Sequence, residues 1–155
     1  MNFRNATMND LDRICEIEQE CFPVSEMASR KNLEWRIEHA YFLLLCQDET
    51  IVSFINGMPT NKSDLCDEMY DGEFFDENGQ WLMIFGVNTP KEYQHQGYAQ
   101  KVMKEVMHQF NGKGIVLTCK EHLIGFYEQF GYKNEGISKS THGDVTWYQM
   151  RWEKS

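Results

Sequence analysis

Apolar residues recur with the period of an α-helix in two long segments of the chain. Residues 98–110 carry them three and four positions apart, at Ala99, Val102, Met103, Val106, Met107 and Phe110. Such spacing makes one face of a helix apolar. Residues 7–22 repeat it, with Thr7 or Asn9 able to cap the first turn and Pro23 following directly. Because the residue before a proline disfavours helical backbone, this helix is predicted to end there.

Two shorter helices are predicted from weaker patterns. Residues 28–39 place Leu33 and Ile37 on one side of a helix. Residues 121–130 form a helical segment followed by Gly131, which is the residue type typical of the position just after a helix.

Short apolar or alternating runs between these helices predict strands. They are residues 2–6, 41–46, 50–55, 81–89, 115–119, 132–137 and 145–152. The second and third are joined by Gln47-Asp48-Glu49, and the last two flank residues 138–143, so each pair is predicted to form a hairpin. The order β-α-α-β-β-β-α-β-α-β-β predicts one layered α/β (α+β) domain over residues 1–155.

Residues 59–79 interrupt this pattern with a long polar segment. Seven acidic residues and no basic residue lie between Asp64 and Glu77. A loop of this length in a small domain is usually functional or mobile. We expect a solvated lid, or a segment that attracts a cationic ligand. Part of it is expected to form a short helix held by apolar side chains, Leu65, Met69, Phe74 and Phe75.

The composition fits a globular domain and limits its ligands. Hydrophobic residues make up 41% of the 155 residues and aromatic residues 14%, which supplies ample side chains for a core. The formal net charge of −9 argues against nucleic acid and anionic membranes as partners, because both attract a basic face. The same charge is compatible with a cationic substrate.

The cysteines indicate a reducing compartment. Their number is odd, and no two have the spacing of metal ligands: Cys15, Cys21, Cys46, Cys66 and Cys119. The first ten residues lack the apolar centre of a signal peptide, and no apolar run approaches the ~20 residues of a membrane span. We therefore expect a soluble cytoplasmic protein without a metal site.

One stretch, Gln94-His95-Gln96-Gly97-Tyr98-Ala99, joins the strand over 81–89 to the helix over 98–110. A strand, a loop of forward-pointing amides and a helix N-terminus together form an anion site. The helix dipole adds about 0.3–1 kcal/mol for an exposed anion. Gly97 and Ala99 have little or no side chain to hold a ligand away. The stretch is predicted to bind phosphate.

Two segments resemble the GCN5-related N-acetyltransferase (GNAT) superfamily. The first, Thr89 to Ala99, resembles the acetyl-coenzyme A (acetyl-CoA) motif of that family, Arg/Gln-x-x-Gly-x-Gly/Ala. The second, Leu117-Thr-Cys-Lys-Glu121 followed by Phe126-Tyr-Glu-Gln-Phe-Gly-Tyr132, is similar to the arylalkylamine (serotonin) N-acetyltransferase branch. The resemblance covers nearly the whole chain. It implies a central mixed sheet, splayed at its fourth and fifth strands, with helices on both faces.

The resemblance also implies acetyl-CoA as co-substrate. Its pyrophosphate would be held by backbone amides of Gln94, His95, Gln96, Gly97, Tyr98, Ala99 and Gln100. Its pantetheine arm and thioester carbonyl would be held where the strands splay, by backbone groups of Val87, Asn88 and Thr89.

Two side chains carry roles implied by the second motif. Thr118 falls where the amine branch contacts its substrate, and Tyr127 falls on the general-acid tyrosine of the family. The chemistry suits a tyrosine, because the departing thiolate needs a proton. A thiol has a pKa of about 8.5 and a phenol about 10, so the phenol is protonated at pH 7.

The proton relay of that branch is missing. The two histidines of its fourth strand align with Met83 and Phe85, neither of which can carry a proton. Candidate bases are Glu26, in the first helix–helix connection, and His142, in the closing hairpin, whose imidazole is suited to proton transfer. Glu121 and a chain of water molecules are further alternatives. An apolar acceptor pocket is expected from some of four side chains, Trp81, Met83, Phe85 and Trp147.

The predicted function is transfer of an acetyl group to a small primary amine by direct attack in a ternary complex. One alternative is an acetyltransferase acting on a protein N-terminus or lysine. Another is a non-catalytic acyl-CoA-binding module, which the missing relay favours. The chain is expected to be a monomer or a homodimer.

Overall fold

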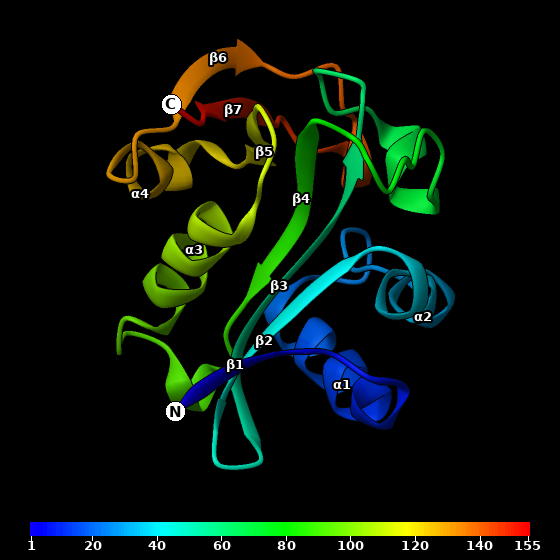
Figure 1. The fold of residues 1–155 in the computed structure, drawn as a ribbon, viewed down its shortest axis with the longest axis vertical. Coiled ribbons are helices and arrows are strands. Elements are labelled where there is room, and N and C mark those ends of the chain that lie inside the picture. The colour runs from blue at the N-terminus through cyan, green and yellow to red at the C-terminus, as the bar shows by residue number, and fades with distance from the viewer.

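A seven-stranded mixed sheet runs through the computed structural model, which describes residues 1–155 (Figure 1). Its order is β1-β2-β3-β4-β5-β7-β6, and all neighbours are antiparallel except β4 and β5. The strands are β1 (Asn2–Asn5), β2 (Tyr41–Gln47), β3 (Thr50–Thr60), β4 (Trp81–Asn88), β5 (Gly114–Cys119), β6 (Lys133–Ile137) and β7 (Tyr148–Glu153).

Helices cover both faces of this sheet. They are α1 (Leu11–Cys21), α2 (Arg30–His39), α3 (Tyr98–Gln109) and α4 (Ile124–Glu128). Figure 1 shows α1 and α2 on one side of the sheet and α3 and α4 on the other. Single-turn 3-10 helices lie between them: η1 (Met8–Asp10), η2 (Asp67–Asp71), η3 (Lys91–Tyr93), η4 (Glu121–Leu123) and η5 (His142–Asp144).

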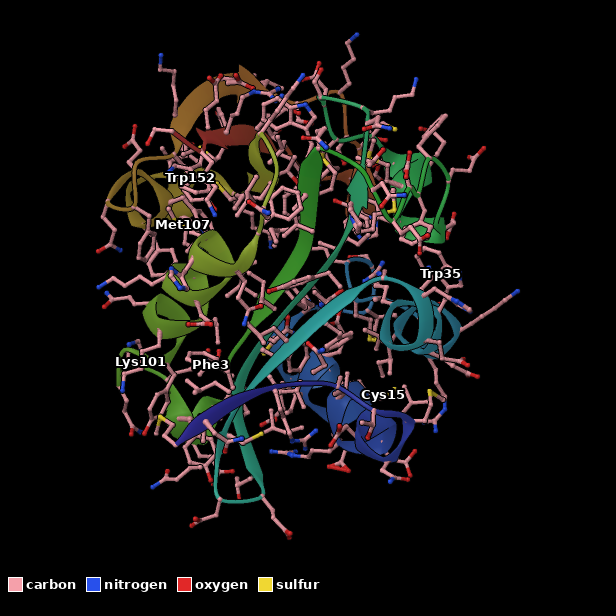
Figure 2. The ribbon with its side chains drawn as sticks, in the orientation of Figure 1. Phe3, Cys15, Trp35, Lys101, Met107 and Trp152 are labelled. Carbon is pink, nitrogen blue, oxygen red and sulfur yellow. The ribbon has the colours of Figure 1, made fainter.

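Strand β2 shows why the sheet needs cover on both faces. All of residues 42–46 are buried. Leu43 and Leu45 belong to the core under α3, whereas their alternate neighbours belong to the core under α1 and α2. Successive side chains of a strand point to opposite faces, so this uninterrupted apolar run requires two cores. Figure 2 shows Phe3, Met107 and Trp152 around the α3-side core.

The parallel pair β4–β5 is short, and this opens the sheet. The two strands pair only between Trp81–Ile84 and Gly114–Leu117. Beyond Ile84 the register of β4 against β3 shifts at Phe85, an extra residue that forms a β-bulge. The ends of β4 and β5 therefore diverge in the middle of the sheet, as the resemblance implied.

The predicted element order, the fold class and the two-sided helix cover are confirmed. Several boundaries differ, two of them for a clear structural reason. Strand β3 continues to Thr60, five residues past its predicted end, because the bulged β4 pairs with it throughout. The predicted helix over 121–130 begins as the turn η4, and α4 covers only Ile124–Glu128. None of the helices combines the length and the apolar character that crossing a membrane requires.

The acidic segment is folded onto the domain. Leu65 and Met69 are buried in a third core, and the expected short helix is η2. Asp64 pairs with Arg151 of β7 at 2.5 Å, and Asp67 accepts a hydrogen bond from the Ser140 hydroxyl. These two contacts join the acidic segment to β7 and to the loop between β6 and β7.

Candidate active site

A cavity of about 650 Å³ lies where β4 and β5 diverge. Its walls come from α1, the α1–α2 loop, α2, β3, β4, β5, η4, α4, η2 and the loop between β6 and β7. Because α2 and α3 lie on opposite faces of the sheet (Figure 1), the gap between the strands connects these two faces.

The predicted phosphate-binding stretch leads into α3 beside this gap. The backbone N–H groups of residues 95–100 donate to no acceptor in the protein. His95 and Gly97 have left-handed backbone, with φ of 65° and 82°, which turns successive amides towards one side. The first N–H groups of a helix carry its positive dipole end. Residues 94–97 are solvent-exposed, so these amides can accept an anion from outside.

The other predicted donor-binding residues lie along the end of β4. Val87 lines the cavity. The carbonyl of Asn88 accepts the Ser53 hydroxyl at 2.9 Å, and the Thr89 hydroxyl lies 3.0 Å from the same Ser53 oxygen. The Asn88 side chain is buried, and its amide donates to the Glu18 carboxylate at 2.8 Å. Of this segment, Val87 is therefore the residue that reaches the cavity wall.

Tyr127 lines the cavity from α4 and is 8% exposed. Its ring packs edge-on against Phe126 and Tyr132, and its hydroxyl makes no hydrogen bond within the protein. Burial raises the pKa of this phenol well above its usual range, with the nearby Cys119 acting in the same direction. The phenol is thus a proton donor at neutral pH.

Two cavity cysteines are poor nucleophiles. Burial raises the pKa of Cys119 to about 11, and burial likewise raises the pKa of Cys21 to about 11. The thiolate is the nucleophilic form of cysteine. Both side chains are therefore thiols at neutral pH, which disfavours an acyl-enzyme.

The structure brings Glu26 and His142, predicted separately, to one wall of the cavity. The Glu26 side chain is 5% exposed, and its carboxylate pairs with Lys120 Nζ at 2.8 Å. The Nε2 atom of His142 lies 2.7 Å from the backbone carbonyl of Glu26. A carbonyl only accepts hydrogen bonds, so Nε2 carries the hydrogen and a neutral ring has its lone pair on Nδ1.

Aromatic rings hold that imidazole in place. His142 stacks on Tyr70 with centroids 4.8 Å apart and lies 6.3 Å from the Trp147 ring. The Trp147 indole donates to the His142 carbonyl at 2.7 Å. A β-carbon at Gly143 would lie 2.8 Å from Glu26 Cγ, so the two loops approach as closely as glycine permits.

Met83 is not a cavity residue, which corrects one predicted substrate contact. Its side chain is fully buried in the core with Met58 and Met69. Phe85, two residues later at the bulge, lines the cavity. Among the other expected residues, Thr118 and Trp147 also line it, and Trp81 does not. Glu121 is solvent-exposed and outside the cavity wall.

Several polar cavity residues escaped the sequence analysis: Glu18, Arg36, Asn56, Tyr70 and Lys120. The first three are buried polar side chains. A polar or charged residue of a helix or strand ordinarily faces solvent, so their burial gave no signal in the sequence. No group of three or more His, Cys, Asp or Glu side chains is arranged to hold a metal ion.

The chain matches a model of a known protein family. Residues 11–132 match the family model described as "Acetyltransferase (GNAT) family". Serotonin N-acetyltransferase of Mesocricetus auratus is 24% identical over 161 residues, covering 96% of this chain and 75% of that protein.

Solved structures share the fold. The GphF GNAT-like decarboxylase in complex with isobutyryl-CoA superposes with a TM-score of 0.83, at 16% identity over 99% of each chain. The ribosomal-protein-S18-alanine N-acetyltransferase from Escherichia coli has a TM-score of 0.77, at 16% identity over 99% of this chain and 94% of that one. At such identities the likeness concerns the fold alone.

Proposed function

Since the chain belongs to the acetyltransferase (GNAT) family, we propose that it transfers an acetyl group from acetyl-CoA to a small primary amine. Family membership confirms the enzyme class and the co-substrate that the two sequence motifs predicted. One observation carries the proposal: six consecutive amides without acceptors stand beside a cavity that contains a protonated, unpaired phenol.

The donor lies across the gap between β4 and β5. Amides of residues 95–100 bind the pyrophosphate, which gains the dipole of α3. Backbone groups of Val87, Asn88 and Thr89 bind the pantetheine arm and the thioester carbonyl. The thioester then reaches the cavity near Tyr127, on the wall formed by α4.

The reaction is a direct displacement in the ternary complex. The neutral amine attacks the thioester carbonyl, and the negative charge that develops on oxygen is stabilised by a backbone amide of β4. The C–S bond then breaks with its electron pair going to sulfur. Tyr127 donates its phenolic proton to that sulfur, and solvent restores the proton afterwards. No covalent enzyme intermediate forms.

His142 accepts the proton that the amine loses. Its Nε2 is committed to the Glu26 carbonyl, so Nδ1 holds the lone pair. Glu26, the other predicted base, is less suited because both carboxylate oxygens lie within 3.1 Å of Lys120 Nζ. In this proposal Glu26 positions His142 and the α1–α2 loop.

Contacts between the loops that cover the cavity favour a small acceptor. The α1–α2 loop and the β6–β7 loop touch at Glu26, His142 and Gly143. Asp67 of η2 binds the β6–β7 loop from a third side, accepting from Ser140 and Thr141. These contacts close the cavity on this side, which suits a small amine, whereas a protein N-terminus or lysine needs an open groove.

Tyr127→Phe tests the mechanism. We expect kcat to fall by about 100- to 10,000-fold, the usual contribution of general acid–base catalysis, with the Kd of acetyl-CoA unchanged. Thioester consumption and product mass over an amine panel measure the rate, and calorimetry measures Kd. An unchanged kcat removes Tyr127 from the mechanism. Wild-type binding of acetyl-CoA without turnover on any amine or peptide favours the acyl-CoA-binding module.

A further inference from the structure

Arg36 of α2 is a buried cation in the cavity wall. The residue is 3% exposed and lines the cavity. Its Nη1 donates to Asn56 Oδ1 and its Nη2 to the Tyr70 backbone carbonyl, each at 3.0 Å. The Nε–H is buried without a partner. Three of the five guanidinium N–H groups therefore have no acceptor in the protein.

No carboxylate forms an ion pair with this guanidinium, although the charges of Glu18 and Asp71 act on it from a distance. Arg36 takes part in none of the ion pairs of the protein. The nearby acids are engaged elsewhere: Glu18 accepts from the Ala28 amide at 2.7 Å and from Asn88 at 2.8 Å, and Asp71 accepts from Asn32.

The arginine stays charged in spite of its burial. Burial lowers the pKa of Arg36 to about 10, still well above neutral. A buried charge whose direct hydrogen-bond acceptors are all neutral is costly. Such a group is stable in a ligand site when the ligand supplies the counter-charge.

The surroundings of Arg36 fit a flat anionic group. The Phe85 ring covers the guanidinium with its centroid 4.6 Å from Cζ, which leaves the edge of the fork for a ligand. Asn56 Nδ2 donates no hydrogen bond. This nitrogen lies 3.4 Å from the position that a β-carbon would occupy at Gly86. Gly86 lines the cavity and has no side chain. An amide and a guanidinium thus present donors together.

We propose that Arg36 binds a carboxylate of the acceptor, so that the substrate class is amines bearing a carboxylate, such as amino acids. This inference rests on the proposed acetyltransferase function. The location favours the acceptor over the donor, because α2 lies on the opposite face of the sheet from α3 and its phosphate-binding amides (Figure 1). Bidentate N–H donors match the two oxygens of a carboxylate.

The test compares each amino acid with its decarboxylated amine, for example phenylalanine with phenethylamine. For the wild type we expect kcat/KM to be about 10- to 100-fold higher for the carboxylated member of the best pair, as for a hydrogen bond to a charged group. Arg36→Gln should abolish this ratio and leave the Kd of acetyl-CoA within about twofold. Arg36→Lys keeps the positive charge but loses the paired N–H donors of the guanidinium, so it should retain part of the ratio.

Two further measurements distinguish acceptor binding from donor binding and from loss of turnover. Calorimetry with N-acetylphenylalanine and N-acetylphenethylamine, each with CoA, measures the preference without turnover. The donor arm compares succinyl-CoA with butyryl-CoA. A wild type without preference for carboxylated amines, or an Arg36→Gln variant that keeps the preference, overturns the inference. Preference for succinyl-CoA that depends on Arg36 overturns the acceptor assignment. Failure to bind acetyl-CoA contradicts the proposed function instead.

Discussion

The proposed donor half and the proposed acceptor half of this site are built in opposite ways. The donor half consists of backbone N–H groups from one continuous stretch, residues 95–100. The acceptor half consists of side chains from separate elements: His142 meets Glu26 across 116 positions of the chain. A local backbone site depends on a few conformations, whereas a site of long-range side-chain contacts depends on the whole fold. The two halves should therefore fail differently when mutated.

Gly97→Val should give the largest effect on the donor half. Gly97 has φ of 82°, and holding a β-branched residue there costs about 1–3 kcal/mol. We expect the variant to rearrange the loop and raise the KM of acetyl-CoA about 10- to 100-fold. The relative kcat/KM of different amines should not change. Steady-state kinetics with varied acetyl-CoA measures this.

Gly136→Val is the matched control. Gly136 has φ of 93° in β6, outside the cavity wall, and no atom lies within 4 Å of its β-carbon position. It carries the same backbone strain away from the site, so it should lower the unfolding temperature and leave the KM of acetyl-CoA unaffected. If both variants raise that KM alike, general destabilisation is the cause and the loop is not a phosphate site.

The contrast between local and long-range contacts also explains which parts of the site could be predicted from the sequence. The conformation of the proposed phosphate-binding loop was predictable because its signal is local: a strand, Gly97 and a helical stripe in succession. Tyr127 lies within a compact motif on one short helix. Arg36, by contrast, lies in a helix whose pattern was weak, and only the tertiary fold turns it inward onto Asn56. Met83 was misassigned because the bulge at Phe85 decides which β4 side chain reaches the cavity.

Lys120→Met should affect the acceptor half and spare the donor half. It leaves the Glu26 carboxylate, 5% exposed, without a counter-charge. Breaking a fully buried pair costs about 3–5 kcal/mol. Because Lys120 is 34% exposed, we expect a loss of about 1–2 kcal/mol in the free energy of unfolding. The α1–α2 loop should also loosen, which lowers kcat/KM for the amine at constant KM for acetyl-CoA.

The double variant Lys120→Met with Glu26→Gln supplies the control. Replacing the carboxylate by a neutral amide removes the unpaired charge, so most of the lost stability should return in urea unfolding. No recovery in the double variant would mean that the lysine stem acts through packing, for instance against Trp147, whose ring lies 6.0 Å from Nζ.

The smallest expected effect concerns pH, at the junction of the two halves. An acid must be protonated to donate, and burial raises the pKa of Tyr127 well above the ordinary value of about 10. The phenol therefore stays protonated, and we expect no loss of wild-type kcat from this group between pH 7 and about pH 10. A fall in kcat over that range that disappears in Tyr127→Phe would show that the phenol titrates normally and faces solvent. Circular dichroism at each pH separates this from unfolding. Because the folded state holds the proton more tightly than the unfolded chain, the stability linked to Tyr127 is intact below about pH 10 and declines only above it.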